Sequence, residues 1–300
     1  MRVFITGASG FIGSATVREL LAHNHTVLGL SRSPASAVAL RALGAEIHNG
    51  SLTDLESLKS GAAQCDGVIH LGFKSDFADP NFDFAASCAT DRVAIEALGS
   101  AIEGTGKPLV VTSGILLLKK GEMRTEDDKA DTEGFAGLRG ASEDVTLALA
   151  TKGIRSMIVR LSPTVHGEGD KGFVPMLLTT ARKNGAAAYI GQGLNRWTAV
   201  HRLDAASLYR LAFEKGVAGG VYHGVAEESL YAKDIAAAIG KGLNMPAESK
   251  TMEEAVGQLG FVAYAFSNDS PASNLKTKEE LGWKPEQLGL IADIEKSYFK

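Results

Sequence analysis

Short apolar runs alternate with longer amphipathic segments through residues 1–161 of the chain. The runs are apolar at consecutive positions, and the segments between them repeat apolar residues at helical spacing. Continuously apolar strands that alternate strictly with helices are typical of a parallel sheet buried on both faces, so we predict a doubly wound α/β fold. The predicted strands cover residues 3–5, 26–30, 45–49, 67–71, 108–114 and 154–161, and the predicted helices cover residues 11–21, 36–43, 55–63, 85–102 and 142–151.

The alternation breaks at residue 162, where glycine and proline punctuate a loop. Helices are predicted beyond it at 173–183, 204–214, 232–243 and 252–259, with Asp204 as the cap of the second, and a late strand at 220–225 returns to the sheet. We therefore expect a Rossmann-type doubly wound domain of residues 1–162 plus about 201–225. A smaller, discontinuous substrate-binding lobe would comprise about 163–200 and 226–300.

The turn after the first predicted strand has the spacing of a dinucleotide-binding motif. It reads Thr6-Gly7-Ala8-Ser9-Gly10-Phe11-Ile12-Gly13 and leads from a clean strand into a clean helix. Gly7 and Gly10 would permit a tight turn close to a pyrophosphate, and Gly13 would let the helix pack against the strand before it. The phosphates would lie at the helix N-terminus, where free N–H groups favour anions. The alternative is an ordinary glycine-rich turn. The predicted cofactor contacts in this turn are Thr6, Gly7, Ser9, Gly10, Phe11, Ile12 and Gly13.

The end of the second strand indicates which dinucleotide is bound. An acidic residue there would accept the ribose 2′-hydroxyl of NAD, whereas an arginine accommodates the 2′-phosphate of NADP. The segment reads Ser31-Arg32-Ser33 and contains no acid. A guanidinium can bind a phosphate with two hydrogen bonds, and the two hydroxyls can add others. We predict NADP(H), against the simpler reading of Arg32 as a solvated surface side chain.

Composition excludes several other classes of protein. A net charge of −4 provides no basic surface for nucleic acid or for a membrane, and no apolar run is long enough to cross a bilayer. Cys65 and Cys88 are too few for a disulfide framework, and we predict no metal site. The N-terminus passes directly into the first strand without the pattern of a signal peptide. We expect a soluble cytoplasmic protein with a small-molecule substrate.

Further motifs accompany TGASGFIG at residues 6–13 and cover nearly the whole chain. They are VIHLG at 68–72, VVTSG at 110–114, VRLSPTVHG at 159–167, NRWTAVHRLDAA at 195–206 and LGW at 281–283. With them the chain resembles the extended short-chain dehydrogenase/reductase family, in its NAD-dependent epimerase/dehydratase branch. That resemblance implies a dinucleotide cofactor and, in many members, a homodimer. The additional cofactor contacts that it implies are Ser51, Leu52, Leu71, Gly72, Thr112, Arg139 and Pro163, although the family often has aspartate at the position of Ser51.

The chain departs from this family where the catalytic groups belong. The family uses a Ser or Thr after the fifth strand and a Tyr-x-x-x-Lys pair on the next helix, and Ser113 fits the first position. When the Tyr-x-x-x-Lys pattern is aligned with this chain, Phe135 stands at the tyrosine position and Arg139 at the lysine position. Glu143 follows four residues after Arg139. Phenylalanine has no proton to give and arginine stays protonated, so the usual mechanism cannot operate. Arg139 could hold the ribose or stabilise an oxyanion beside Ser113, or it could form a surface ion pair with Glu143.

A proton donor must then come from another group or from water. His166 and Lys74 are the first candidates, followed by His201, although a lone histidine is often only structural. The resemblance places one wall of the substrate site after the fourth strand, where Phe73, Phe77, Phe82 and Phe84 cluster, and local packing of the loop would explain these rings equally well. The predicted substrate contacts are Phe73, Phe135, Arg196 and Trp197, which suit an apolar or aromatic molecule.

Three functions fit these residues. The first is an NADP(H)-dependent oxidoreductase acting on a carbonyl or alcohol of a small, apolar or aromatic metabolite. The second is a redox-neutral isomerase, epimerase, dehydratase or cyclase, for which the missing tyrosine is no handicap. The third is an NADP(H)-binding protein without catalytic activity, and fold analogy alone does not separate the three.

Overall fold

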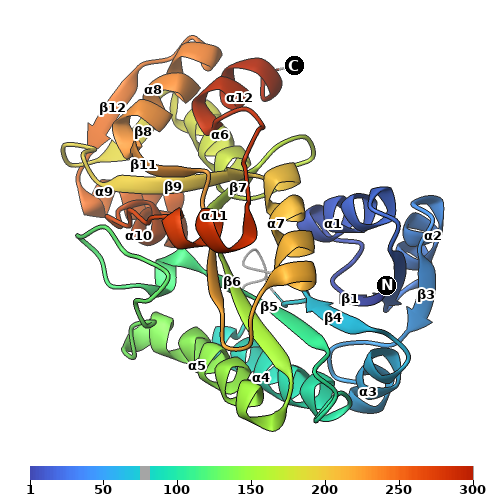
Figure 1. Ribbon diagram of the computed structural model, residues 1–300. Coiled ribbons are helices and arrows are strands. Elements are labelled where there is room, and N and C mark those ends of the chain that lie inside the picture. The colour runs from blue at the N-terminus through green and yellow to red at the C-terminus, as the bar shows by residue number, and fades with distance from the viewer. Residues whose placement is uncertain (75–81, 300) are drawn as a thin grey trace.

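A seven-stranded parallel sheet forms the centre of the computed structural model, which describes residues 1–74 and 82–299 (Figure 1). Its strand order, β10-β6-β5-β4-β1-β2-β3, reverses direction beside β1, as expected for the doubly wound fold. The predicted parallel α/β architecture is therefore confirmed. The strands are β1 (Arg2–Thr6), β2 (Thr26–Ser31), β3 (Glu46–Asn49), β4 (Gly67–His70), β5 (Pro108–Gly114), β6 (Arg155–Leu161) and β10 (Val221–Gly224).

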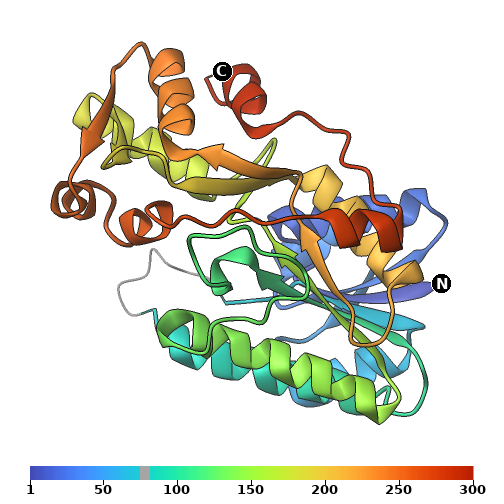
Figure 2. The same cartoon turned by 60° about the vertical axis from the view of Figure 1, so that its left-hand side comes forward.

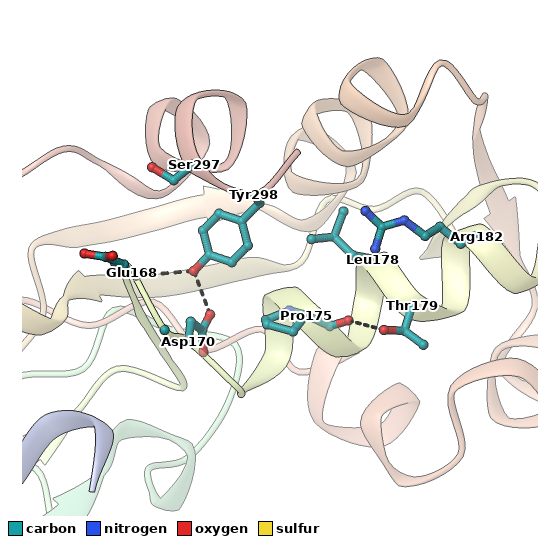
Figure 3. Close-up of a pocket in the computed structure, with 10 residues that line it drawn as sticks. Glu168, Asp170, Pro175, Leu178, Thr179, Arg182, Ser297 and Tyr298 are labelled. Atoms are coloured by element: carbon teal, nitrogen blue, oxygen red, sulfur yellow. Dashed lines mark hydrogen bonds between the residues drawn. The ribbon is translucent and has the colours of Figure 1, made fainter. Parts of the chain in front are cut away.

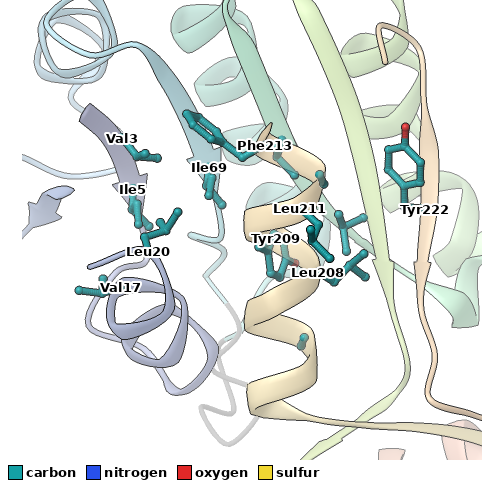
Figure 4. Close-up of a cluster of buried hydrophobic side chains, with 14 of the residues drawn as sticks. Val3, Ile5, Val17, Leu20, Ile69, Leu208, Tyr209, Leu211, Phe213 and Tyr222 are labelled. Atoms are coloured by element: carbon teal, nitrogen blue, oxygen red, sulfur yellow. The ribbon is translucent and has the colours of Figure 1, made fainter. Parts of the chain in front are cut away.

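Alternation along the strands sends neighbouring side chains into two separate cores. Val3 and Ile5 of β1 enter the core beneath α1 and α7, which Figure 4 shows, whereas Phe4 enters the opposite core beneath α3 and α4. The helices of this part are α1 (Phe11–Ala22), α2 (Pro34–Ala42), α3 (Leu55–Ala63), α4 (Phe84–Ser100), α5 (Gly134–Ala148) and α7 (Arg202–Lys215).

A third buried core lies outside the large sheet and is built from segments that precede and follow α7 in the sequence. These segments gather on one side of the large sheet (Figure 2). It surrounds Trp197, which packs edge-on against Phe173 and Phe266. The assignment of this part as a substrate-binding lobe stays a prediction. Its strands are β7 (Thr164–His166), β8 (Ala187–Ile190), β9 (Arg196–His201), β11 (Glu227–Tyr231) and β12 (Ala247–Lys250), and the remaining helices are α6 (Phe173–Asn184), α8 (Ala232–Leu243), α9 (Met252–Leu259), α10 (Phe261–Phe266), α11 (Leu275–Leu281) and α12 (Leu290–Ser297).

Two helix starts differ from the sequence prediction. Helix α5 begins at Gly134, eight residues before the predicted start, because the glycines of GFAGLRG weaken the helical signal. At Gly137 a Cβ would lie 2.2 Å from the Thr132 carbonyl oxygen, so the glycine allows a close approach. Helix α7 is capped by the His201 side chain, not by Asp204, whose carboxylate accepts the backbone N–H groups of residues 286 and 287.

Short strands account for most of what the sequence pattern missed. Strands β7 and β9 run through VRLSPTVHG and NRWTAVHRLDAA, where loops or no regular structure were predicted. Each has few residues and is stabilised by its neighbours, β7 by β9 and β9 by β11. Such tertiary pairing leaves little trace in local hydrophobic periodicity.

Candidate dinucleotide site and neighbouring catalytic groups

The turn between β1 and α1 is too tightly packed for any side chain at two of its glycines. Gly7 has a φ of +69°, and a Cβ on it would lie 2.7 Å from the backbone nitrogen of Gly72. A Cβ on Gly13 would lie 2.1 Å from the Gly7 carbonyl oxygen, so Gly13 packs against the turn itself, not against the strand as predicted. Gly10 has an ordinary φ of −73° and is the N-cap of α1. Gly7 and Gly13 thus let the turn pack closely against residues 71–72 and against the start of α1.

No side chain caps the start of α1, so its first N–H groups are available to an anion. The predicted contacts Leu52, Leu71 and Gly72 gather beside the turn: a Cβ on Gly72 would lie 2.9 Å from the Leu52 side chain. Gly72 also donates its backbone N–H to the Thr6 hydroxyl at 3.1 Å. Pro163 follows β6 and is partly buried.

A cavity of about 560 Å³ lies at the end of β2. Ser31, Arg32 and Ser33 line it together with Ser51 and with Arg41, which the sequence analysis did not single out. Among the described residues, neither guanidinium has a hydrogen-bonding or ionic partner. The one carboxylate that lines the cavity, Asp54, is already the N-cap of α3 and accepts the Ser57 N–H.

These features fit an NADP(H) molecule. The glycine turn provides a side-chain-free cradle with unpartnered helix N–H groups for a pyrophosphate. The cavity adds two arginine side chains and serine hydroxyls, which are the donors that a 2′-phosphate requires.

A buried chain of hydrogen bonds leads from this turn to α5. The Thr6 hydroxyl lies 2.7 Å from Nδ1 of His70, and Nε2 of His70 lies 3.3 Å from the Asp91 carboxylate. Asp91 also binds the guanidinium of Arg139. An ionised carboxylate only accepts hydrogen bonds, so Nε2 of His70 donates to Asp91, and Nδ1 faces the Thr6 hydroxyl. Burial alone would raise the pKa of Asp91, but His70 and Arg139 outweigh burial and the pKa is lowered.

Arg139 therefore points inward, as the family frame requires. Its second terminal nitrogen donates to the Thr112 carbonyl oxygen at 2.7 Å, and its guanidinium lies 4.7 Å from the centre of the Phe73 ring. The alternative reading of a surface ion pair with Glu143 is wrong. Thr112 is itself held by its hydroxyl, which donates to the His70 carbonyl oxygen and lies 2.8 Å from the Tyr209 hydroxyl.

Glu143 instead joins Ser113 to Arg160. The Ser113 hydroxyl donates to Glu143 at 2.6 Å, and Arg160 binds both oxygens of the same carboxylate at 2.9 and 2.7 Å. A carboxylate bound by a guanidinium is charged and can only accept, so the Ser113 hydrogen points at Glu143. The Ser113 oxygen can therefore accept a hydrogen bond from a ligand.

Aromatic rings gather above Arg139. Phe135 stacks on Phe84 with 3.8 Å between ring centres, and Phe84 makes edge contacts with Phe73 and Phe82. Three rings of the predicted grouping, Phe73, Phe82 and Phe84, thus lie together with Phe135, while Phe77 lies outside the described residues. Lys74 follows Phe73 and is exposed.

The structure places three other predicted site residues away from this group. Trp197 is 1% exposed and donates its indole N–H to the Thr164 hydroxyl, so it belongs to the third core and faces no open site. Arg196 forms an ion pair with Asp269, which satisfies its charge. His166 is also 1% exposed, and its Nδ1 lies 2.8 Å from the Asp293 carboxylate. The partners Thr164, Asp269 and Asp293 lie far from these residues in the sequence, so the motifs alone could not reveal the contacts.

A second cavity of about 620 Å³ lies between α6, α12 and the loop after β7 (Figure 3). Asp170 and Tyr298 line it and are joined by a 2.7 Å hydrogen bond. Burial raises the pKa of both groups, and the Asp170 charge raises that of Tyr298 further. None of the predicted catalytic or cofactor residues lines this cavity.

The sequence analysis missed His70, Tyr209 and Arg160, although all three are buried polar residues in predicted strands or helices. A polar residue within an apolar run is the signal that could have identified them. Within the described residues, no cluster of side chains could hold a metal ion and no helix is long and apolar enough to cross a membrane.

Comparison with known proteins is consistent with this geometry. A sequence profile of the NAD dependent epimerase/dehydratase family matches residues 3–223. An uncharacterized protein of Saccharomyces cerevisiae is 45% identical over 300 residues, covering 99% of both chains. A 4-hydroxy-2-methyl-3-oxo-4-farnesyl-3,4-dihydroquinoline-1-oxide ketoreductase of Stigmatella aurantiaca is 28% identical over 74% of this chain and 67% of its own. The crystal structure of human epimerase family protein SDR39U1 with NADPH shares the fold, with a TM-score of 0.76, 21% identity and coverage of 99% and 98%.

Proposed function

The chain belongs to the NAD dependent epimerase/dehydratase family of extended short-chain dehydrogenases/reductases, and from this we propose that it is an NADP(H)-dependent oxidoreductase. It would interconvert a carbonyl and an alcohol on a small, apolar or aromatic metabolite. The observation that carries the proposal is the 560 Å³ cavity at the end of β2, which Arg32 and Arg41 both line. A human protein of the same fold crystallised with NADPH gives further support.

The substrate class follows from the rings above Arg139. Phe73, Phe84 and Phe135 present apolar surface beside a guanidinium, and such an environment favours planar or alkyl groups over a sugar. The Stigmatella relative, named as a ketoreductase of a farnesylated quinoline oxide, is consistent with an apolar ketone.

Ser113 and Glu143 would take the place of the absent tyrosine. The bound nicotinamide supplies the hydride for carbonyl reduction or accepts it during alcohol oxidation. In oxidation the substrate hydroxyl would donate its proton to the Ser113 oxygen while Ser113 passes its own proton to Glu143. In reduction Glu143 would first take up a proton from solvent, and the two transfers would then run in reverse. Arg160 holds the carboxylate in position, and Arg139 adds a fixed positive charge nearby.

A redox-neutral reaction is the second candidate, and Phe135 is the observation that favours it. A phenylalanine at the tyrosine position removes the usual acid for a carbonyl but does not impair an isomerisation or elimination that leaves the cofactor unchanged.

One assay tests the proposal and separates the two candidates. The purified protein is mixed with NADPH and a panel of aromatic and alkyl ketones and aldehydes, while absorbance at the nicotinamide band and the product are both followed. We expect NADPH oxidation to match the alcohol formed, one for one. Product without NADPH oxidation would establish the redox-neutral reaction instead. NADPH binding without any product from any compound of the panel would contradict both candidate functions.

A further inference from the structure

Arg202 lies at the first position of α7, across from the dinucleotide turn. Its guanidinium is 5.3 Å from the centre of the Phe11 ring, and Phe11 is the first residue of α1. Helices α1 and α7 pack against each other, so their N-termini meet at this point (Figure 1). A side chain from the middle of the chain thus reaches the site where a pyrophosphate is expected.

The guanidinium has no anionic partner within residues 1–74 and 82–299. It takes part in no ion pair or hydrogen bond there, and its Nε is buried without an acceptor. A buried donor that lacks an acceptor destabilises the fold, and native proteins leave few such groups.

The surroundings hold this side chain in place. A Cβ on Gly167 would lie 3.2 Å from Cγ of Arg202 and 2.7 Å from Nε2 of His201, and one on Gly169 would lie 3.8 Å from an Arg202 terminal nitrogen. The φ angles of the two glycines, +128° and +83°, suit no other residue well. The loop after β7 therefore packs onto the Arg202 stem and fixes the direction of its charged end.

The electrostatics of this position call for an anion. Arg202 places a full positive charge at the N-terminal ends of α1 and α7, which already carry partial positive charge. The Arg202 charge also acts on His201. Burial, the His166 charge and the Arg202 charge lower the pKa of His201 to about 4, with Asp293 opposing them. The uncapped start of α1, at the glycine turn, is a position that favours a bound anion.

We propose that Arg202 binds the pyrophosphate of the dinucleotide from the side opposite the glycine turn, so that both helix N-termini and one guanidinium enclose the phosphates. The inference rests on the proposed cofactor site and deepens it, because it assigns a charged contact to a residue outside the dinucleotide motif. Arg202 is a binding residue here and takes no part in proton transfer.

The test uses three ligands that differ in the pyrophosphate. NADPH and 2′-phospho-ADP-ribose contain it, and adenosine 2′-monophosphate does not. Dissociation constants are measured by calorimetry for the full chain and for Arg202→Met, Arg202→Lys, Arg32→Ala and, as a control on the exposed face of α1, Arg18→Met. Circular dichroism and thermal melting verify that each variant is folded.

Arg202→Met is expected to weaken NADPH and 2′-phospho-ADP-ribose by about ten- to a hundredfold, the value of a hydrogen bond to a charged group, and to leave adenosine 2′-monophosphate within about twofold. Arg202→Lys should recover part of the loss, Arg32→Ala should weaken the binding of all three ligands, and Arg18→Met should change the affinity for none.

Unchanged NADPH affinity in folded Arg202→Met would overturn the inference while leaving the proposed function intact. A higher substrate KM with unchanged cofactor affinity would overturn it as well, by assigning Arg202 to an anionic substrate. Wild-type protein that binds none of the ligands would refute the proposed function itself.

Discussion

Arg139 on α5 and Asp91 on α4 form a buried ion pair beside the C-terminal ends of β5 and β4. The two charges compensate each other: Asp91 is 1% exposed and Arg139 12%. Nε2 of His70 donates to the other Asp91 oxygen, so the pair connects the glycine turn to the candidate catalytic groups.

The first prediction concerns this pair. Asp91→Asn removes one charge and leaves Arg139 buried without compensation, so the free energy of unfolding should fall by about 3 kcal/mol. Urea denaturation at pH 7 measures the change, and the double variant Asp91→Asn/Arg139→Met should recover part of it. Strictly additive losses would show that the two residues are not coupled.

The second prediction concerns Ser113. Ser113→Ala removes the proton acceptor proposed for the substrate hydroxyl, so kcat/KM should fall by about a hundredfold while NADPH affinity stays unchanged. Ser162→Ala is the matched control, because Ser162 is a buried serine at the end of β6 whose hydroxyl bonds only a backbone carbonyl. Equal kinetics in the two variants would exclude Ser113 from the proton path.

The third prediction restores the missing phenol. Phe135→Tyr places a hydroxyl on the ring that stacks against Phe84, at the position the family frame assigns to the general acid. Ketone reduction by NADPH should rise in this variant by about tenfold or more, since a positioned acid contributes at least that factor. A variant that binds NADPH normally and shows no gain would argue against the Phe135–Arg139 frame.

The fourth prediction concerns stability in acid. The pKa of His201 is lowered from 6.5 to about 4 by burial and by the His166 charge, with Arg202 adding to both and Asp293 opposing them. Between these values the unfolded chain binds more protons than the folded one, so the free energy of unfolding falls as the pH drops from about 6.5 to 4.

His201→Asn removes the titration and keeps a side-chain acceptor for the Leu203 N–H at the start of α7. The acid-induced loss of stability between pH 7 and 4 should be smaller in this variant by about 1–2 kcal/mol, measured as urea midpoints at several pH values. Parallel profiles for the two proteins would contradict the assignment.

The repeated features of the fold were predictable from local sequence. Continuously apolar runs located the parallel strands, because a strand buried on both faces is apolar at successive positions. TGASGFIG located the turn after β1, because that turn requires glycines at a fixed spacing. Helix α5 was placed too late because its glycines fit close packing that only the folded chain reveals.

Partnerships between distant residues were not predictable. The family frame identified Arg139 and Glu143, but their spacing of four residues suggested a mutual ion pair. In the structure Arg139 meets Asp91 from α4, whereas Glu143 meets Arg160 from β6. Likewise, Trp197 and Arg196 were expected at a substrate site, and their partners Thr164 and Asp269 became evident only from the tertiary contacts.

Calorimetric titration of the wild-type protein with NADPH and with NADH tests the central claim most directly. We predict that NADPH binds at least about tenfold more tightly than NADH, and that Arg32→Ala removes this preference while Arg18→Ala preserves it. Equal affinity for the two dinucleotides would contradict the assignment of the cavity at the end of β2, and no affinity for either would contradict the dinucleotide site as a whole.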